Sequence, residues 1–220
     1  MHVVIAGGHG KIGLRLAASL AGRGDVVTGV VRNPDHTAEV ERAGATAAVL
    51  DLETATAAEL AAVVAGADAV VFAAGAGPGS GVARKDTVDR AAAVLLADAA
   101  ALAGVRRYLL VSSTGVDEPL APDAGEVWAA YVAAKKAAEE AVSARADLDW
   151  TILRPGGLTD DPGTGRVLLR PPPVPRGDVT RDDTAAVLVA LLDAPRSAGT
   201  ILELREGDTD VVEAVSVVSA

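Results

Sequence analysis

The chain contains no cysteine and very few aromatic residues. The absence of cysteine excludes disulfide bonds, thiolate catalysis and cysteine-ligated zinc. Only 2% of the 220 residues are aromatic, although 50% are hydrophobic, so the core must be built from Ala, Val, Leu and Ile. This composition favours a parallel sheet covered by alanine-rich helices, because runs of Val and Ile are typical of strands that are buried on both faces.

Basic residues, histidines and long apolar runs are also scarce. With 20 Lys and Arg against 30 Asp and Glu, the net charge is -10. This charge argues against nucleic-acid binding, because phosphate contacts need clustered cations. His2, His9 and His36 lack the spacing of a metal site, so no bound metal is expected. No apolar run approaches the length of a membrane span, and the N-terminus lacks the basic start and apolar stretch of a signal peptide.

These absences narrow the class of protein. We expect a cytoplasmic protein that acts on a small-molecule substrate, with neither a nucleic-acid partner nor a membrane partner. At 220 residues the chain is long enough for one well-buried core. The sequence leaves the oligomeric state open, and a homo-oligomer is among the alternatives.

Strand-like and helix-like segments alternate along most of the chain. The predicted strands cover residues 2–6, 25–31, 46–50, 69–73, 107–111 and 150–153, and the predicted helices cover residues 11–21, 33–44, 57–65, 85–103 and 126–144. Thr56 and Glu59 have the spacing of a capping box at the start of one helix. Residues 74–81 and the segment that contains Pro119 and Pro122 are predicted loops. The alternation predicts an α/β fold, a Rossmann-like doubly wound parallel sheet with helices on both faces.

The periodicity weakens beyond Gly157, and Arg154-Pro155-Gly156-Gly157 is predicted to interrupt the sixth strand. After it come an extended piece (163–170), a proline-rich loop (171–175), a helix (182–192), a strand (201–204) and a terminal helix (210–218). This part is too short for a core of its own. We therefore expect one domain over residues 1–220, in which residues 157–200 are a small C-terminal portion that folds over the carboxyl edge of the sheet and covers the substrate side.

A glycine-rich turn links the first predicted strand to the first predicted helix. Its sequence is Gly7-Gly8-His9-Gly10-Lys11-Ile12-Gly13. One of the spaced glycines permits a sharp turn, one lets the backbone lie close to a pyrophosphate, and one lets the helix pack tightly on the sheet. The free N–H groups and the positive end of the helix dipole then face the phosphates. The turn therefore predicts a dinucleotide site.

The end of the second predicted strand indicates which dinucleotide binds. Enzymes that use NAD usually carry an acidic residue there for the ribose 2′-hydroxyl, whereas enzymes that use NADP carry a cation for the 2′-phosphate. Here the strand ends in Val30-Val31-Arg32, with no carboxylate before Asp35. The forked guanidinium of Arg32 suits a phosphate, so NADP(H) is favoured over NAD(H). The alternative is that Arg32 is a solvated residue before a turn.

A second candidate site combines hydroxyl groups with a lysine. Ser112 and Ser113 follow the fifth predicted strand, and Tyr131 and Lys135 share one helix face because they are four residues apart. A lysine cation lowers the pKa of a nearby phenol, and a hydroxyl positions a carbonyl for protonation while hydride arrives from a nicotinamide. The pattern is typical of a carbonyl reductase. The alternative places Tyr131 in an apolar helix stripe and pairs Lys135 with Glu139 on a solvated face.

Motifs along nearly the whole chain resemble those of the atypical short-chain dehydrogenase/reductases. They are GGHGKIG, VVRNP, VLDL, YLLVSSTGVD, YVAAKKAAEE and WTILRPGGLTDDPGTGRV, followed by RDDTAAVLVALL. The resemblance is to small NAD(P)-binding members that are NmrA-like or similar to biliverdin reductase B, a flavin reductase. It implies an NADP(H)-dependent oxidoreductase that reduces a small carbonyl, quinone or flavin-like acceptor by hydride transfer. Since some members of the family sense the cofactor, a non-catalytic NADP(H)-binding regulator or redox sensor is the alternative.

The resemblance also assigns roles to individual residues. It places Tyr131 and Lys135 on the YxxxK pair, with Ser113 orienting the acceptor. The cofactor site that it implies consists of Gly7, His9, Gly10, Lys11, Ile12, Gly13, Arg32, Asp51, Leu52, Ala74, Gly75, Ser112, Pro155, Gly156 and Gly157. Asp51 has the place of an adenine contact or, alternatively, of a residue that ends a strand. Sugar-nucleotide epimerisation is a weaker alternative, because the C-terminal portion offers little room for a nucleotide sugar.

Overall fold

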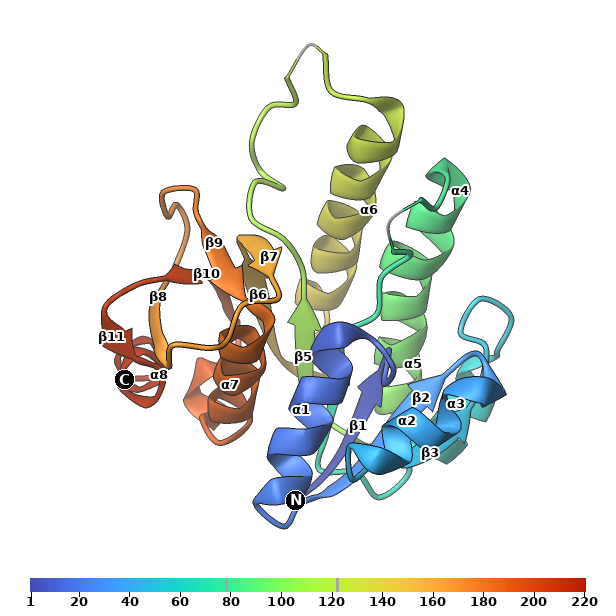
Figure 1. Ribbon diagram of the computed structural model, residues 1–220. Helices are drawn as coiled ribbons and strands as arrows, with labels where there is room; N and C mark the ends of the chain where they lie inside the picture. Colours follow the sequence, from blue (N-terminus) through green and yellow to red (C-terminus); the bar gives the residue numbers. More distant parts are fainter. Residues whose placement is uncertain (78, 122) are drawn as a thin grey trace.

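The computed structural model describes residues 1–77, 79–121 and 123–220. Pro78 and Pro122, each within a predicted loop, lie outside the described residues. Within the described part, a sheet of nine strands has the order β11-β8-β10-β6-β5-β4-β1-β2-β3 (Figure 1). The strands are β1 (His2–Ala6), β2 (Val26–Val31), β3 (Thr46–Val49), β4 (Ala69–Phe72), β5 (Arg107–Val111), β6 (Asp149–Pro155), β8 (Arg166–Arg170), β10 (Thr200–Glu206) and β11 (Thr209–Asp210). A separate two-stranded ribbon pairs β7 (Gly157–Thr159) with β9 (Asp178–Thr180).

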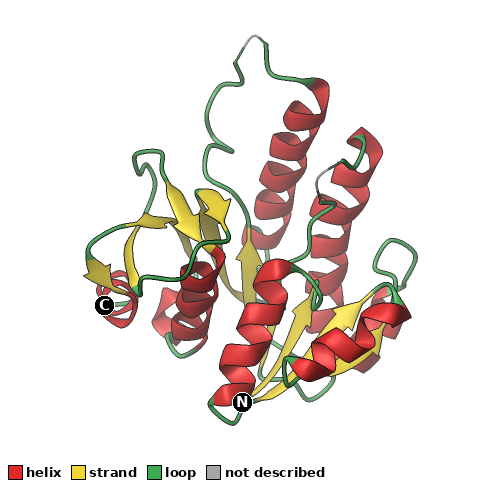
Figure 2. Ribbon diagram, viewed as in Figure 1, coloured by secondary structure: helices red, strands yellow, loops and turns green. Residues whose placement is uncertain are grey.

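Helices cover both faces of the large sheet (Figure 2). They are α1 (Lys11–Gly22), α2 (Thr37–Arg42), α3 (Ala57–Val64), α4 (Val82–Arg84), α5 (Ala92–Ala103), α6 (Glu126–Ser143), α7 (Arg181–Leu192) and α8 (Val211–Val218), with short 3-10 turns at Pro34–His36 and Pro195–Ser197. Leu16 of α1 and Leu188 of α7 belong to the hydrophobic cluster of one face, and Leu60 of α3 and Leu96 of α5 belong to the cluster of the other. Both clusters consist mainly of Val, Leu, Ile and Ala, as the shortage of aromatic residues requires.

The strand directions confirm the predicted doubly wound parallel sheet. From β3 across to β10, each strand pairs in parallel with its neighbour. The predicted capping box is also present. The Thr56 hydroxyl accepts a hydrogen bond from the Glu59 N–H, and the Thr56 N–H donates to the Glu59 carboxylate, so the start of α3 is set by local sequence.

The C-terminal part departs from the prediction in two respects. The predicted interruption at Arg154 is wrong, because β6 continues through Pro155 and pairs with β5 and β10. The arginine stays in the strand because its guanidinium is buried and donates to the carboxylates of Glu139 and Asp117. Residues 166–170, within the predicted extended piece, form β8, which lies between β10 and β11 and is antiparallel to both, an arrangement that an alternation of strands and helices does not predict.

The long helix predicted at residues 85–103 is present but is not uniformly α-helical. It begins with the short α4, continues through a π-helical turn at Lys85–Ala91, and ends in α5. A π-helical turn holds more residues than an α-helical turn, so the side chains that follow it point in changed directions. Here the turn buries two charged side chains, those of Lys85 and Asp89.

The carboxyl ends of the parallel strands define where a ligand can bind. The strand β1 lies between β2 and β4, so the strand order reverses at its carboxyl end. Open α/β sheets bind ligands in the crevice that such a reversal creates. The glycine-rich turn leaves β1 at this point and leads directly into α1 (Figure 1).

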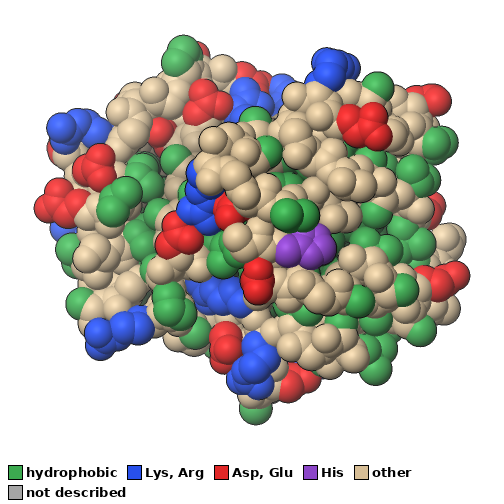
Figure 3. Space-filling view, turned by 90° about the horizontal axis from the view of Figure 1, so that it is seen from below, with side chains coloured by type: hydrophobic (Ala, Val, Ile, Leu, Met, Phe, Trp, Pro, Cys, Tyr) green, Lys and Arg blue, Asp and Glu red, His purple; other side chains and the backbone are tan. Residues whose placement is uncertain are grey.

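The surface carries charges of both signs. On the face shown in Figure 3, Lys and Arg side chains lie among Asp and Glu side chains rather than in one basic patch. Among the helices of residues 1–77, 79–121 and 123–220, none is long and apolar enough to cross a membrane.

Candidate cofactor and active site

The glycine-rich turn has no room for side chains at two of its predicted positions. Gly7 has a φ of +86°, and a Cβ placed there would lie 2.7 Å from the backbone of Ala74. A Cβ at Gly13 would lie 2.3 Å from the carbonyl oxygen of Gly7, so only glycine lets α1 pack this closely on the turn. Gly10, which caps α1, has no side chain to bind the N–H groups of the first helical turn. These groups are therefore left for a ligand, and they suit a pyrophosphate.

A cavity of about 230 Å³ opens beside this turn and is called cavity A here. The predicted cofactor residues that line it are Gly7, His9, Gly10, Arg32, Asp51, Leu52, Ala74 and Gly75. Asp51 accepts a hydrogen bond from the Glu53 N–H at 3.0 Å, so it also fixes the turn after β3. The structure is compatible with both predicted roles of Asp51, that of an adenine contact and that of a residue that ends a strand.

Cavity A contains an arginine pair that shares one carboxylate. Arg32 Nη1 donates to Glu53 Oε2 at 2.9 Å, and Arg84 Nη2 donates to the same oxygen at 2.8 Å. The Thr87 hydroxyl donates to the other oxygen at 2.7 Å. These donors, Arg84 first and then Thr87, hold the pKa of Glu53 below its usual range. Arg32 thus faces the predicted site, with Glu53 as its present partner.

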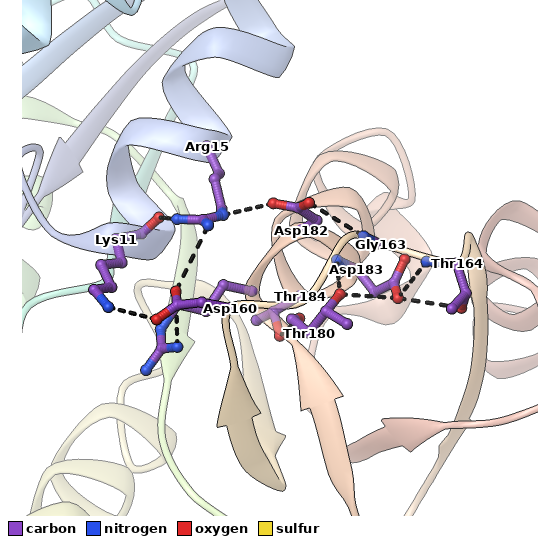
Figure 4. Close-up of polar contacts among 10 residues, drawn as sticks. Lys11, Arg15, Asp160, Gly163, Thr164, Thr180, Asp182, Asp183 and Thr184 are labelled. Atoms are coloured by element: carbon purple, nitrogen blue, oxygen red, sulfur yellow. Dashed lines mark hydrogen bonds and ion pairs between the residues drawn. The ribbon is translucent and has the colours of Figure 1, made fainter.

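His9 and Lys11, the two long side chains of the glycine-rich turn, contact residues outside the turn. The His9 and His36 rings stack with their centroids 3.6 Å apart, and His9 also pairs with Glu39. Lys11 does not line cavity A and pairs with Asp160, in the loop after β7 (Figure 4).

Asp160 joins the first helix to the C-terminal part of the chain. It pairs with Lys11 and Arg15 from α1 and with Arg181 from the start of α7, whose Nη1 lies 3.0 Å away. Lys11 in particular keeps the pKa of Asp160 low. Arg15 also donates to Asp182, which in turn accepts from the N–H of residue 163 (Figure 4). The loop after β7 is therefore tied down beside the glycine-rich turn.

A second cavity, called cavity B, has a volume of about 720 Å³ and shares Ala74 and Gly75 with cavity A. It is lined by all the predicted catalytic residues and by the predicted cofactor residues that cavity A lacks, except Lys11 and Gly13, which line neither cavity. These are Ile12, Ser112, Ser113, Tyr131, Lys135, Pro155, Gly156 and Gly157. The structure therefore brings the hydroxyl and lysine site predicted from sequence next to the glycine-rich turn.

Lys135 lines cavity B and is buried, so it does not lie on a solvated helix face. Its Nζ donates to the carbonyl oxygen of Val111 at 3.0 Å and lies 3.4 Å from Asp89 Oδ1. It also lies 5.9 Å from the centroid of the Tyr131 ring. The alternative pairing of Lys135 with Glu139 is wrong, because Glu139 holds Arg154. Burial lowers the pKa of Lys135, and the negative charge of Asp89 opposes this effect.

Tyr131 is in contact with both charged and aromatic neighbours. Lys85 Nζ lies 5.4 Å from its ring centroid, and the Trp128 ring lies 5.3 Å away. Burial raises the pKa of the Tyr131 phenol, whereas the Ser113 hydroxyl lowers it. The phenol is therefore protonated at neutral pH and is able to donate a proton. Trp128 is half exposed at the mouth of the cavity.

Arg154 is buried and directly precedes Pro155, which lines cavity B. Its Nε donates to Glu139 Oε1 at 2.9 Å, and its Nη1 donates to Asp117 Oδ2 at 2.6 Å. Glu203 lies 3.8 Å away and accepts the N–H of Val174. Burial lowers the pKa of Arg154, but the hydrogen bonds that it donates to Glu139 and Asp117, together with the charges of these carboxylates, outweigh this effect and raise the pKa. One guanidinium thus joins α6 to the loop that follows β5 and lies near Glu203 of β10, which holds the loop after β8.

Sequence reasoning missed several residues of the two cavities. Lys85 and Asp89 could have been found, because they occupy the stripe that continues with Ala92 and Leu96 toward the sheet, where charged residues are unexpected. Glu53 and Arg84 carry no such pattern. They meet only because the loop after β3 and the helix after β4 begin at the same edge of the sheet.

Comparisons with known proteins agree with this geometry. A family model described as NAD(P)H-binding matches residues 7–195. The chain is 35% identical to the uncharacterized sugar epimerase YhfK of Bacillus subtilis, over 98% of this chain and 99% of the relative. A Bacillus halodurans structure named for NAD-dependent epimerases/dehydratases is 32% identical, with a TM-score of 0.90 and 99% of both chains covered. The anaerobillin reductase ChuY of Escherichia coli is 27% identical, with a TM-score of 0.76 and with 96% of this chain and 99% of that chain covered.

Proposed function

Because the chain belongs to the NAD(P)H-binding family and is an atypical short-chain dehydrogenase/reductase, we propose that it is an NADP(H)-dependent oxidoreductase. We propose further that it reduces a small carbonyl, quinone or flavin-like acceptor by hydride transfer. One observation carries this proposal. Tyr131 and Lys135 line the cavity that adjoins the glycine-rich turn, so a proton donor lies where the far end of a dinucleotide would reach.

The two cavities fit the two halves of one extended cofactor. The first-turn N–H groups of α1 would hold the pyrophosphate, and cavity A, with Asp51 and Leu52, would hold the adenosine. The backbone at Ala74 and Gly75, which both cavities share, would lie along the middle of the molecule. Pro155, Gly156 and Gly157 would lie beside the nicotinamide, which supplies the hydride when NADPH is bound.

The preference for NADP(H) is supported by the arginine pair of cavity A. Arg32 and Arg84 both donate to one carboxylate, that of Glu53, and a 2′-phosphate would offer the same guanidinium groups a more highly charged partner. The proposal is tested by titrating wild type and Arg32→Ala with NADPH and with NADH. Wild type should bind NADPH more tightly, and the substitution should remove most of that difference. Equal affinity of wild type for the two cofactors would contradict it.

The residues of cavity B would share the chemistry. Tyr131 would donate or relay a proton to the acceptor, and Ser113 would orient the acceptor. Lys135 would hold the nicotinamide ribose and stabilise the phenolate that the donation leaves. We propose that residues 157–200 cover the substrate side, since Leu158 and Arg181 line cavity B. We also propose that residues 1–220 form one domain.

A screen of NADPH oxidation with carbonyls, quinones and flavins, run beside a binding measurement, tests the proposal. Wild type should bind NADPH and oxidise it with at least one class of acceptor. Binding without oxidation by any acceptor would instead support the non-catalytic regulator or redox sensor. Absence of NADPH binding would contradict both functions.

Epimerisation is a second candidate, because two of the similar proteins carry epimerase names. An epimerase returns its hydride within one catalytic cycle, so it causes no net oxidation of NADPH. Interconversion of nucleotide sugars without a change in cofactor absorbance would therefore favour this candidate over the reductase.

A further inference from the structure

A buried carboxylate, that of Asp89, lies between the cofactor cleft and Lys135. Its Oδ2 accepts a hydrogen bond from the Ala76 N–H at 3.2 Å, and its Oδ1 lies 3.4 Å from Lys135 Nζ. A Cβ built on Gly75 would lie 3.2 Å from Oδ1, so the carboxylate touches the turn that both cavities share. Within the described residues, Oδ1 makes no well-aligned hydrogen bond. One oxygen of Asp89 is thus held by the Ala76 N–H, and the other faces the Lys135 ammonium.

The π-helical turn explains how an acidic side chain reaches this place. Asp89 lies on the turn at Lys85–Ala91, whose extra residue changes the direction of the side chains on the cavity side. Lys85, from the same turn, is also buried, and its Nζ donates to the Gly77 carbonyl oxygen at 3.2 Å. One irregular turn of helix therefore brings a carboxylate and a second lysine to cavity B.

The charged groups around Lys135 leave Asp89 as its main counter-charge. The groups around it come from four elements. They are Tyr131 and Glu139 of α6, Lys85 and Asp89 of the π-helical turn, the Phe72 ring of β4 and the Val111 carbonyl of β5. Both carboxylate oxygens of Glu139 accept hydrogen bonds from Arg154. The positive charge of Lys85 repels the Lys135 ammonium and lowers its pKa. Asp89 is the nearby carboxylate that no arginine of the described residues holds.

We propose that Asp89 is a positioning residue of the reaction, which keeps the Lys135 ammonium charged and in place beside Tyr131. The Ala76 N–H in turn fixes Asp89, so the turn along which the cofactor would lie also sets the lysine. The inference rests on the proposed function only for the role given to Lys135 in catalysis. The dependence of Lys135 on Asp89 is a property of the protein without cofactor or acceptor.

Burial gives this pairing its importance. A lysine enclosed by protein loses its proton more readily than one in water, and burial lowers the pKa of Lys135 accordingly. The negative charge of the Asp89 carboxylate, 3.4 Å from the ammonium, opposes that lowering of the pKa. Without the carboxylate, Lys135 would lose its proton at a lower pH and would then neither stabilise a phenolate nor hold its present position.

The lysine content of the chain makes a direct measurement practical. Lysine occurs only at positions 11, 85, 135 and 136, so NMR of lysine labelled with ¹³C at Cε gives few signals, and Lys→Arg variants assign them. We would titrate the protein without cofactor as wild type, as Asp89→Asn and as Asp86→Asn. Asp86 lies on the same turn but is exposed and pairs with Arg90, so its substitution is a matched control.

The Asp89→Asn variant should lower the titration midpoint of Lys135 by about one pH unit or more, which is a tenfold change in its acid dissociation constant. The Asp86→Asn variant should leave that midpoint unchanged. A Lys135 midpoint in Asp89→Asn equal to that of wild type would overturn the proposal. Because the titration involves neither NADPH nor an acceptor, it can succeed even if the chain proves not to be a reductase.

A urea-unfolding cycle keeps the proposal testable if Asp89→Asn does not fold. Removing the lysine alone, as Lys135→Met, leaves a buried carboxylate without its counter-charge, so this variant should unfold at a lower urea concentration than wild type. The double variant Asp89→Asn/Lys135→Met should unfold at the same or a higher urea concentration than Lys135→Met. A double variant that unfolds at a clearly lower urea concentration than Lys135→Met would show that removal of the carboxylate gives no relief, and it would overturn the proposal.

Discussion

The two cavities of the cleft hold their charges in different environments. In cavity A the side chains of Arg32 and Arg84 are 54% and 39% exposed around Glu53. In cavity B the side chains of Lys135 and Asp89 are 6% and 1% exposed. Exposed ion pairs contribute roughly 0–1 kcal/mol each and exchange partners readily. Buried pairs cost several kcal/mol of desolvation for each ion and persist only in a fixed geometry.

This difference in exposure agrees with the function proposed for each cavity. Glu53 is a partner that a cofactor phosphate can replace at little energetic cost, so cavity A suits recognition. The lysine and the carboxylate of cavity B are already in place before any ligand arrives, so cavity B suits chemistry. Changes in cavity A should therefore alter affinity, and changes in cavity B should alter turnover.

The largest expected effect is that of Tyr131→Phe. Loss of the phenolic proton should lower turnover of a carbonyl or quinone by about 10²–10⁴-fold, which is the usual contribution of a general acid. NADPH affinity, measured by fluorescence titration, should stay within about twofold, because the phenol contributes little to binding in this account. Steady-state NADPH oxidation reports the turnover.

The chain offers a matched control for this substitution. Tyr108 is the other tyrosine and is fully buried, with its hydroxyl donating to the Ala93 carbonyl away from both cavities. Tyr108→Phe should retain wild-type turnover. Wild-type turnover in Tyr131→Phe would remove that residue from the mechanism, although reduction of a flavin-type acceptor, which needs no acid from the protein, would be compatible with it.

A second prediction concerns stability and contrasts buried with exposed ion pairs. Arg154→Met should lower the free energy of unfolding by about 3–5 kcal/mol, because it leaves the buried Glu139 carboxylate without its partner. Arg106→Met removes an exposed pair with Asp149 and should lower it by less than about 1 kcal/mol. Urea unfolding followed by circular dichroism measures both. Similar losses for the two variants would contradict the contrast.

The sequence predicts cavity A and the main elements better than it predicts cavity B. The glycine-rich turn, the Thr56 cap and the strand and helix periods are local patterns, so they hold wherever the chain folds as an α/β protein. Arg32 is equally local, because it ends β2. Its partners Glu53 and Arg84 come from two other segments, and only the strand order brings the three together.

Cavity B depends on features that local patterns do not contain. Asp89 lies on a π-helical turn and Lys135 lies on α6, so their contact is made between two elements and no local pattern predicts it. Arg154 was expected to break a strand, because the four residues from Arg154 to Gly157 are typical of a loop. It stays in β6 because carboxylates from α6 and from a distant loop surround its guanidinium. In both cases tertiary contacts override the local preference.

A third, smaller effect is expected in cavity A. Arg32→Ala should weaken NADPH binding by about tenfold, because a charge-assisted hydrogen bond to the 2′-phosphate is lost while Arg84 remains. NADH binding should change by less than about twofold. Calorimetric titration measures both, and the NADPH effect should shrink at high salt because the side chain is exposed. Equal losses for the two cofactors would place Arg32 away from the 2′-phosphate.

The smallest expected effect is a gain of affinity. Glu53→Gln removes the carboxylate that competes with the 2′-phosphate for two guanidinium groups, so NADPH should bind about two- to fivefold more tightly. Affinity for NADH should not change. The same titrations test this prediction, and weaker NADPH binding would mean that Glu53 orients the arginines for the cofactor rather than competing with it.

One measurement tests the division between recognition and chemistry most directly. It is the rate of NADPH oxidation by a single acceptor as a function of NADPH concentration, for wild type, Arg32→Ala and Tyr131→Phe in parallel. At saturating NADPH, Arg32→Ala should reach the wild-type rate, whereas Tyr131→Phe should remain slower by about 10²-fold or more at every concentration. An Arg32→Ala variant that stays slow at saturation, together with a Tyr131→Phe variant that recovers there, would contradict the account.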